Sequence, residues 1–277
     1  MVTGRSFTRL FVRFVALPLL FIAGVQLYVF SERTDTYFAW TIALPLTAAF
    51  LGAGFWAALV AGYMSWWQSP SVAARVLGLT SLAATGILGI ATLLHLDKFH
   101  LNSPAALTRF VTWVWIIVYV VTPFIFLWLW IAYGRSKDDT MGARPFPQWV
   151  RTVYLFQAAL MLIAGVLLFL APASISPIWP WALTPLTARA VSAWMIAFGL
   201  ACVTVYRENN TANTLGARIS LLAFCVLQLI AVARYFPSFE LAKPLAWVYL
   251  LLMLVGVAAN LPALLPADQI GVVDEGR

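Results

Sequence analysis

The chain has 277 residues, of which 63% are hydrophobic and only 10% are Asp, Glu, Lys or Arg. A soluble domain is about 45–50% apolar and about 25% charged, whereas the mean hydropathy here is +0.91. These values exclude soluble globular, disordered and disulfide-scaffold proteins. The formal net charge of +7 is spread over many short loops, so it indicates membrane topology and not a nucleic-acid partner.

Apolar runs long enough to cross a bilayer recur along the whole sequence. A transmembrane helix needs about 20 mostly apolar residues, and these runs lack the alternation typical of an outer-membrane barrel. Three arginines precede the first run, but that run is long for a signal peptide and we expect a retained helix. The sequence predicts an all-α, polytopic membrane bundle of eight helices, at residues 10–30, 40–66, 75–95, 109–133, 150–171, 183–206, 215–236 and 244–266.

The loops divide Lys and Arg unequally between the two sides of this bundle. Most of the 17 basic residues fall on the side that holds the N-terminus, and the loop at 134–151 supplies many of them. The positive-inside rule then predicts cytoplasmic N- and C-termini. We expect a bacterial inner (plasma) membrane as the location, membrane lipid as the main partner, and other membrane subunits as a second class of partner.

Two four-residue words occur twice in the chain. Pro45–Ala48 recurs as Pro185–Ala188, and Ile22–Val25 recurs as Ile163–Val166. The two offsets differ by a single position, so one deletion aligns both words, and the matches fall at equivalent places in a unit of four helices. Because four is even, both copies enter the membrane from the same side, which predicts two parallel four-helix repeats.

This duplication divides the chain into residues 1–136 and 137–277. Duplicated membrane proteins commonly bind their ligands where the two repeats meet. The interface between the halves is therefore the place where we expect a ligand or a transport path.

One short segment contains both histidines of the chain. His95, Asp97 and His100 follow the third predicted helix, and two imidazoles with a carboxylate are a donor set that can hold Zn, Fe or Cu. The alternative is an interfacial loop whose polar side chains face lipid headgroups. In the alignment of the two halves His95 corresponds to Tyr235 and His100 to Glu240, so we expect His100 and Glu240 to pair if the two loops meet.

Thr47 and Thr187 follow the repeated prolines Pro45 and Pro185. A proline in a membrane helix frees a carbonyl that a nearby hydroxyl can satisfy, which predicts a kink or a broken first turn at each position. Symmetric breaks of this kind also line binding sites in duplicated transporters. A kink alone and a kink that lines a site both stay open.

Polar residues are otherwise scarce within the predicted spans. All ten Asp and Glu residues lie in loops, tails or helix ends, whereas proton-coupled proteins normally keep an ionisable residue within the bilayer. This distribution disfavours proton coupling. Gln26, Gln157 and Gln228 favour hydrogen bonds between helices, and Cys202 and Cys225 are typical of small buried hydrophobes.

Small and aromatic residues are placed as in other membrane helices. Gly54, Ala58 and Gly62 lie four apart on the second predicted helix, and Gly78 and Gly86 lie eight apart on the third. Such spacing lets helices approach closely in lipid, so it indicates packing. Tryptophans near the predicted helix ends are typical of anchors in the headgroup region, namely Trp40, Trp66, Trp67, Trp128, Trp130, Trp149, Trp179 and Trp181.

Three classes of function are compatible with these features. The first is a non-catalytic binding or scaffold protein for an apolar ligand, a lipid or a partner membrane subunit, which the many aromatic residues and short loops favour. The second is a small-molecule transporter or channel with its path at the repeat interface. The third is a membrane enzyme whose outer-face site combines His95, Asp97, His100 and Glu240, with or without a metal. The sequence identifies no cofactor.

Overall fold

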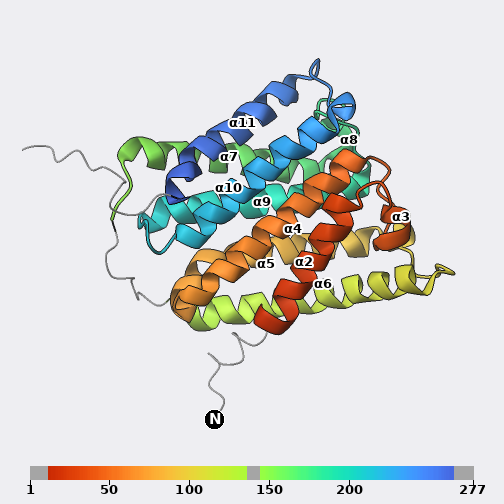
Figure 1. Ribbon diagram of the computed structural model, residues 1–277, viewed down its shortest axis with the longest axis horizontal. Helices are drawn as coiled ribbons and strands as arrows, with labels where there is room; N and C mark the ends of the chain where they lie inside the picture. Colours follow the sequence, from red (N-terminus) through yellow and green to blue (C-terminus); the bar gives the residue numbers. More distant parts are fainter. Residues whose placement is uncertain (1–11, 136–143, 265–277) are drawn as a thin grey trace, which may run out of the picture.

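The computed structural model describes residues 12–135 and 144–264 (Figure 1). These residues form an all-α bundle, and no β-strand occurs among them. Seven helices are long and apolar enough to cross a membrane, and a shorter apolar helix, Phe14–Val29, accompanies them. The predicted fold class, a helical membrane bundle of about eight helices, is confirmed.

The long helices run between the two ends of the bundle. The first is α2 (Leu17–Gly24), which the π-helical turns η1 (Val12–Ala16) and η2 (Val25–Val29) extend. The others are α4 (Pro45–Met64), α5 (Pro70–Leu94), α6 (Ala106–Tyr133), α7 (Gln148–Leu170), α9 (Pro185–Glu208), α10 (Leu215–Arg234) and α11 (Pro244–Asn260). Two one-turn helices, α3 (Thr34–Tyr37) and α8 (Pro172–Ile175), lie at the right-hand end of the bundle in Figure 1.

Polar contacts tie the loops together at one end of the bundle. Gln68, between α4 and α5, donates from Nε2 to the carbonyl of Asn213, between α9 and α10, at 2.9 Å. Arg75 of α5 forms an ion pair with Glu208 of α9 at an N–O distance of 2.6 Å. We call this the Gln68 end, and the opposite end, where α5 stops beside His95, the His95 end.

Four of the long helices begin with a proline in the first turn, where its missing N–H costs no helical hydrogen bond. The helix predicted from residue 40 therefore starts at Pro45, and the one predicted from residue 183 starts at Pro185. Residues 38–44 are not helical, and Trp40 instead makes an antiparallel backbone bridge with Phe99. Neither repeated proline kinks a helix, because each is the first residue of one.

One proline does lie inside a helix and shapes its packing. Pro123 of α6 has no N–H to donate to the carbonyl of Tyr119, four residues before it. That carbonyl faces Gly89 of α5, where a Cβ would come within 2.8 Å of the oxygen. A glycine lets α5 approach the carbonyl that Pro123 leaves free, so the two residues together fix the α5–α6 contact.

The second helix of each half packs against the third helix of the other half. α4 packs against α10, and α9 packs against α5. α4 also meets α9, where the indole of Trp194 covers Gly54 and would overlap any Cβ placed there. The alignment of the two halves pairs Gly54 with Trp194, so these residues meet where a two-fold axis between the halves would pass.

The interhelical hydrogen bonds predicted for Gln157 and Gln228 are confirmed, and the one predicted for Gln26 stays a prediction. Gln228 of α10 donates from Nε2 to the carbonyl of Phe50 on α4 at 3.0 Å, and its Oε1 accepts from the hydroxyl of Tyr249 on α11 at 2.8 Å. Gln157 of α7 donates to the carbonyl of Leu252 on α11 at 3.3 Å. These bonds hold helices together where apolar surface alone gives little association.

Aromatic rings form a buried cluster at the His95 end. Trp40 packs against Phe99 with 5.0 Å between ring centroids, and Trp181 packs against Phe239 at 6.2 Å. Trp40, Trp179 and Trp181 are at most 3% exposed, so the prediction that they anchor the chain among headgroups is wrong. Their rings pack on one another and on helices α6 and α11. Four of the other five predicted anchors are exposed, as an interfacial anchor requires, namely Trp66, Trp67, Trp128 and Trp149.

A glycine in each repeated word marks where the first helix of each half meets the second. Gly24 of α2 faces Trp56 of α4, whose indole would overlap a Cβ. Gly165 of α7 faces Ile196 of α9, where a Cβ would lie 2.7 Å from Cγ1. Trp56 and Ile196 are equivalent in the alignment of the two halves, so both halves use the same contact.

We expect Gly24→Ala and Gly165→Ala each to lower the free energy of unfolding by about 1–3 kcal/mol, the usual cost of overpacking. The added methyl group would push α2 or α7 away from its neighbour. Thermal unfolding in detergent measures the effect. The matched control is Gly86→Ala on α5, where a Cβ meets no atom within 4 Å. Equal melting temperatures for all three variants would contradict the assigned contacts.

Candidate functional site

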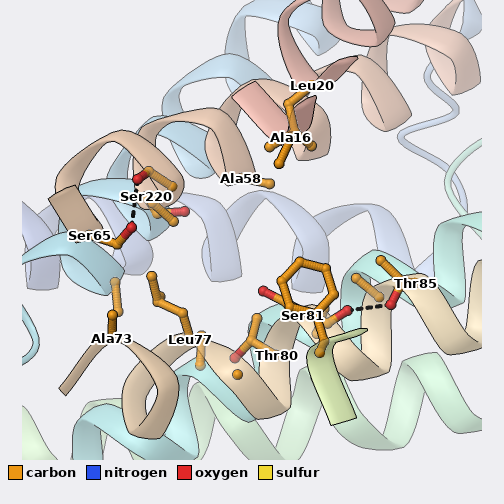
Figure 2. Close-up of a pocket in the computed structure, with 18 of the residues that line it drawn as sticks. Ala16, Leu20, Ala58, Ser65, Ala73, Leu77, Thr80, Ser81, Thr85 and Ser220 are labelled. Carbon is orange, nitrogen blue, oxygen red and sulfur yellow. Dashed lines mark hydrogen bonds between the residues drawn. The ribbon is translucent and has the colours of Figure 1, made fainter. Parts of the chain in front are cut away.

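A cavity of about 200 Å³ opens within the first half of the chain. Its walls come from α2, α4, α5 and α6, and α9 and α10 border it from the second half. It extends along α5 from Pro70 to Leu88, about 27 Å at the helical rise of 1.5 Å per residue. At the Gln68 end it reaches Trp66, which is 37% exposed. Figure 2 shows the α5 wall, with Ala73, Leu77, Thr80, Ser81 and Thr85 labelled.

The cavity exists because its walls carry small side chains. Ala58 and Gly62 line it from α4, Gly78 and Ala84 from α5, and Ala16 from the turn before α2. None of the described residues in its lining is acidic or basic. The space is therefore suited to an apolar or neutral occupant, because an unpaired charge is costly in such surroundings.

Some of the polar groups in the lining are already paired. The hydroxyls of Ser65, Thr85 and Ser220 donate to backbone carbonyls of the walls at 2.7, 2.8 and 2.7 Å. In Figure 2 the bonds of Ser65 and Thr85 are drawn as dashed lines. These hydroxyls need no further partner to remain inside the bundle.

Three other polar atoms of the lining have no hydrogen-bond partner among the described residues. They are Oε1 of Gln68, Oγ1 of Thr80 and Nε1 of Trp194, and all three are shielded from solvent. A buried polar group left unpaired costs about 1–3 kcal/mol. Such groups are rare in native structures, and each calls for an explanation such as a bound molecule or water.

At five of the lining positions the second half of the chain carries a larger side chain, whereas the equivalents of Leu17, Leu77 and Tyr119 are alanines. The alignment of the two halves pairs five of the lining residues as follows: Ala16 with Gln157, Ala58 with Phe198, Gly62 with Cys202, Gly78 with Arg218 and Ala84 with Phe224. Each of the five larger residues is at most 4% exposed. Phe198 and Phe224 stack with 4.2 Å between centroids, and the guanidinium of Arg218 lies 5.0 Å from the ring of Phe146. At these five positions the second half therefore has buried side-chain volume that the first half lacks.

The predicted site residues lie at the His95 end, outside the lining of the cavity. Arg189 of α9 donates from a terminal guanidinium nitrogen to Nε2 of His95 at 2.7 Å. Burial, followed by the charge of Arg189, lowers the pKa of His95 from its ordinary value of 6.5. Asp97 pairs with Lys98 at 2.9 Å, and this hydrogen bond lowers the pKa of the Asp97 carboxyl.

His100 is held by the loop that precedes α4. Its Nδ1 donates to the carbonyl of Phe38 at 3.1 Å, and the hydroxyl of Thr41 lies 3.0 Å from Nε2. Both ring nitrogens are therefore engaged by the first half of the chain. The contacts of His100 fix the loop after α5 against the loop before α4.

No group of three or more His, Cys, Asp or Glu side chains within residues 12–135 and 144–264 is arranged to hold a metal ion. Nε2 of His95 accepts from a cation, and both nitrogens of His100 have other partners. The metal site at His95, Asp97 and His100 stays a prediction, and these contacts do not favour it.

His100 and Glu240 occupy equivalent backbone positions. The N–H of His100 donates to the carbonyl of Ala39 at 3.0 Å, and the N–H of Glu240 donates to the carbonyl of Pro180 at 2.8 Å. The carboxylate of Glu240 pairs with Lys243 at 2.9 Å. Each residue therefore has partners in its own half, and the expected His100–Glu240 pair stays a prediction.

Tyr235 connects the two halves at the His95 end. Its hydroxyl contacts the hydroxyl of Ser31 and lies 3.4 Å from a carboxylate oxygen of Glu32. The neighbouring Arg234 donates to the carbonyl of Tyr28 at 2.8 Å. Both residues thus tie the end of α10 to the segment after α2.

Thr47 and Thr187 lie in the first turns of α4 and α9. The hydroxyl of Thr187 accepts from the N–H of Thr184 at 2.8 Å and completes a capping box, the reciprocal side-chain and backbone bonding that closes a helix start. Leu44 replaces that threonine before α4, and the hydroxyl of Thr47 has no hydrogen-bond partner within the described structure. Neither threonine lines the cavity.

The sequence contained a signal for the cavity that was interpreted only as packing. Of the small residues at four-residue spacing on α4, Gly54 does pack against Trp194, but Ala58 and Gly62 line the cavity. The spacing shows where a helix surface is bare. It does not show whether another helix covers that surface.

No protein-family model, curated protein or solved structure matches the chain. The geometry of the described residues is therefore the basis for the functional argument.

The Arg189–His95 contact makes stability depend on pH. His95 is neutral when it accepts from Arg189, and its lowered pKa means that the unfolded chain takes up a proton more readily than the folded one. We expect thermal stability in detergent to be highest above pH 6.5 and to fall as the pH drops below that value, through the lower pKa of the folded state. Comparison of melting temperatures between pH 7.5 and pH 5 checks this. His95→Gln keeps an acceptor but cannot titrate, so it should remove part of the pH dependence; an unchanged profile would contradict the assignment.

Proposed function

We propose that this membrane protein is a non-catalytic binding protein that holds the hydrocarbon chain of a lipid in the cavity between α2, α4, α5 and α6. The observation that carries the proposal is an uncharged hollow in one half of the chain whose equivalent in the other half is occupied by larger side chains. A hollow that was merely a feature of the fold would recur in both halves.

The free energy of the empty cavity supports an occupant. At roughly 24 cal/mol per Å³, a void of about 200 Å³ would cost about 5 kcal/mol. The cavity reaches the exposed Trp66, beside which lipid chains surround the bundle. A chain that enters there regains contact with the walls and removes most of the cost.

We also propose that the two halves arose by duplication, with residues 1–136 and 137–277 as the copies. The reciprocal α4–α10 and α9–α5 contacts support this. So do the matched backbone bonds of His100 and Glu240 and the matched glycine contacts of α2 and α7. Because of this duplication, the side chains of the second half can be compared, position by position, with those that line the cavity in the first half.

The charge distribution supports an orientation with the Gln68 end in the cytoplasm. Arg75, Arg144, Arg151, Arg207 and Arg218 are at that end among the described residues, together with the loop at 134–151 that gave the strongest basic bias. Positive charge is retained on the cytoplasmic side of inner-membrane proteins. The cavity then opens toward the inner leaflet.

Single introduced cysteines test the orientation. A membrane-impermeant maleimide should label Ala242→Cys, exposed at the His95 end, in intact cells. It should label Gln148→Cys, exposed at the Gln68 end, only after the membrane is permeabilised. The native Cys202 and Cys225 are buried and give a low background. The reverse labelling pattern would overturn the orientation.

The transporter and the outer-face enzyme remain predictions, and no contact of the described residues singles out either. The cavity has no charged lining residue among those described to attract an ion, and the side chains of His95, Asp97 and His100 all have protein partners. Binding of an apolar chain is the function that the geometry supports best.

A cavity-filling variant tests lipid binding directly. A 16-carbon alkyl diazirine in lipid nanodiscs should cross-link to peptides from α4 and α5, as detected by mass spectrometry. Ala58→Phe places in the first half the residue that the second half carries at the same position, and we expect it to reduce that cross-linking about tenfold, a loss of about 1.4 kcal/mol of binding free energy. Ala159→Phe, on the exposed side of α7, is the matched control and should leave cross-linking unchanged.

Equal cross-linking of α4 and α5 in the wild type and in Ala58→Phe would show that the probe reports only the lipid around the bundle. The proposed function would then be wrong. Melting temperatures of both variants establish that they remain folded.

A further inference from the structure

We infer that the lipid in the cavity carries an uncharged hydroxyl or carbonyl group, which hydrogen-bonds to Thr80 and Trp194 near the middle of the membrane. This inference rests on the proposed function and narrows the class of ligand. It begins from the polar atoms of the lining that have no partner among the described residues.

The chemistry of the Thr80 and Trp194 atoms is complementary to a single neutral polar group. Nε1 of Trp194 can only donate, Oε1 of Gln68 can only accept, and the hydroxyl of Thr80 can do either. A carbonyl accepts from Trp194 and from Thr80, and a hydroxyl accepts from Trp194 while donating to Thr80. A pure hydrocarbon would leave all of these atoms unpaired, although they are shielded from solvent.

The positions of Thr80 and Trp194 place the polar group at mid-depth. Thr80 lies ten residues after Pro70, where α5 begins at the Gln68 end, which is about 15 Å at 1.5 Å per residue. Trp194 lies nine residues after Pro185, where α9 begins at the His95 end, which is about 14 Å. The hydrocarbon core is about 30 Å thick, so both residues lie near its centre although they are counted from opposite ends.

The absence of charge from the described lining excludes a charged headgroup at this depth. A phosphate, a carboxylate or an ammonium group would require a counter-ion, and the described lining has no Asp, Glu, Lys, Arg or His. An isolated charge far from water is much more costly than a neutral dipole. Gln68, at the mouth of the cavity, is left to bind a second hydroxyl or a water.

Water is the competing occupant of the cavity, because ordered water molecules can also form hydrogen bonds with buried indole and hydroxyl groups. Water needs two or more polar partners for each molecule, and most of the cavity wall between Ala73 and Leu88 is apolar. A chain with one polar group matches this wall better than a row of waters does.

Four probes of equal chain length separate these occupants. Hexadecane, hexadecanol, methyl palmitate and palmitate at pH 8 would each compete with the alkyl diazirine for cross-linking in nanodiscs. We expect hexadecanol and methyl palmitate to compete about tenfold more strongly than hexadecane, and palmitate to compete least. Equal competition by hexadecane and hexadecanol would overturn the inference.

Two variants assign the preference to the named atoms. Thr80→Val keeps the shape of the side chain and removes the hydroxyl, and Trp194→Phe removes the indole N–H. Both should abolish the advantage of hexadecanol over hexadecane while hexadecane still competes. Thr152→Val, on the exposed side of α7, is the matched control and should preserve the advantage. An unchanged advantage in Thr80→Val and Trp194→Phe would show that these atoms are satisfied by water.

The two proposals fail in different ways. If Ala58→Phe abolishes cross-linking but all neutral probes compete equally, the cavity binds a chain and the inferred polar group is wrong. If no probe competes and Ala58→Phe has no effect, the proposed function itself is wrong.

Discussion

Lipid chains are as apolar as leucine side chains, so helices in a bilayer gain little by burying apolar surface against one another. Association depends instead on short-range contact, and the closest contacts form where one backbone is bare. Gly24 receives the indole of Trp56, Gly54 receives the indole of Trp194, and Gly89 receives the carbonyl of Tyr119. Each of these contacts sets the position of one helix on another. The remaining arrangement of the bundle follows from them.

The same bare surfaces explain the cavity. Ala58, Gly62 and Gly78 continue the small-residue stripes of α4 and α5 and line the cavity, with Leu17 beside Gly62 and Trp130 beside Gly78 at its edges. In the second half, α7 brings Tyr154, whose hydroxyl bonds to Asn260 of α11 at 2.8 Å, and Gln157, which bonds to the same helix. In the first half Ala16, in the turn before α2, stands at the position that aligns with Gln157. The same kind of small-residue helix surface therefore forms a close-packed contact where a neighbouring helix brings a large side chain against it. It lines a hollow where the neighbouring helix does not.

Because packing depends on the side chains of the neighbouring helix, the sequence predicted the helices well but few of the contacts between them. Hydropathy located the long helices to within a few residues, and the spans predicted for α7 and α10 were nearly correct. Hydropathy does not distinguish a ring that faces lipid from one that faces another ring, so buried Trp40 and Trp181 were taken for interfacial anchors. Arg189 is far from His95 in the sequence, and only the packing of α9 against α5 brings the two together.

The polar groups of the protein differ in a way that bears on function. At the His95 end several polar groups pair with one another, as in the pairs of His95 with Arg189 and of Asp97 with Lys98. These pairs stabilise the ends of the helices without a ligand, although the indole N–H groups of Trp40, Trp179 and Trp181, packed among other rings, have no partner among the described residues. In the cavity, Thr80 and Trp194 have no such partners among the described residues. Because buried polar groups in native proteins are normally paired, an unpaired set beside a hollow is informative, whereas a paired set at a helix end is ordinary. The histidine loop is the more conspicuous feature of the sequence, but the cavity is where a ligand would complete the structure.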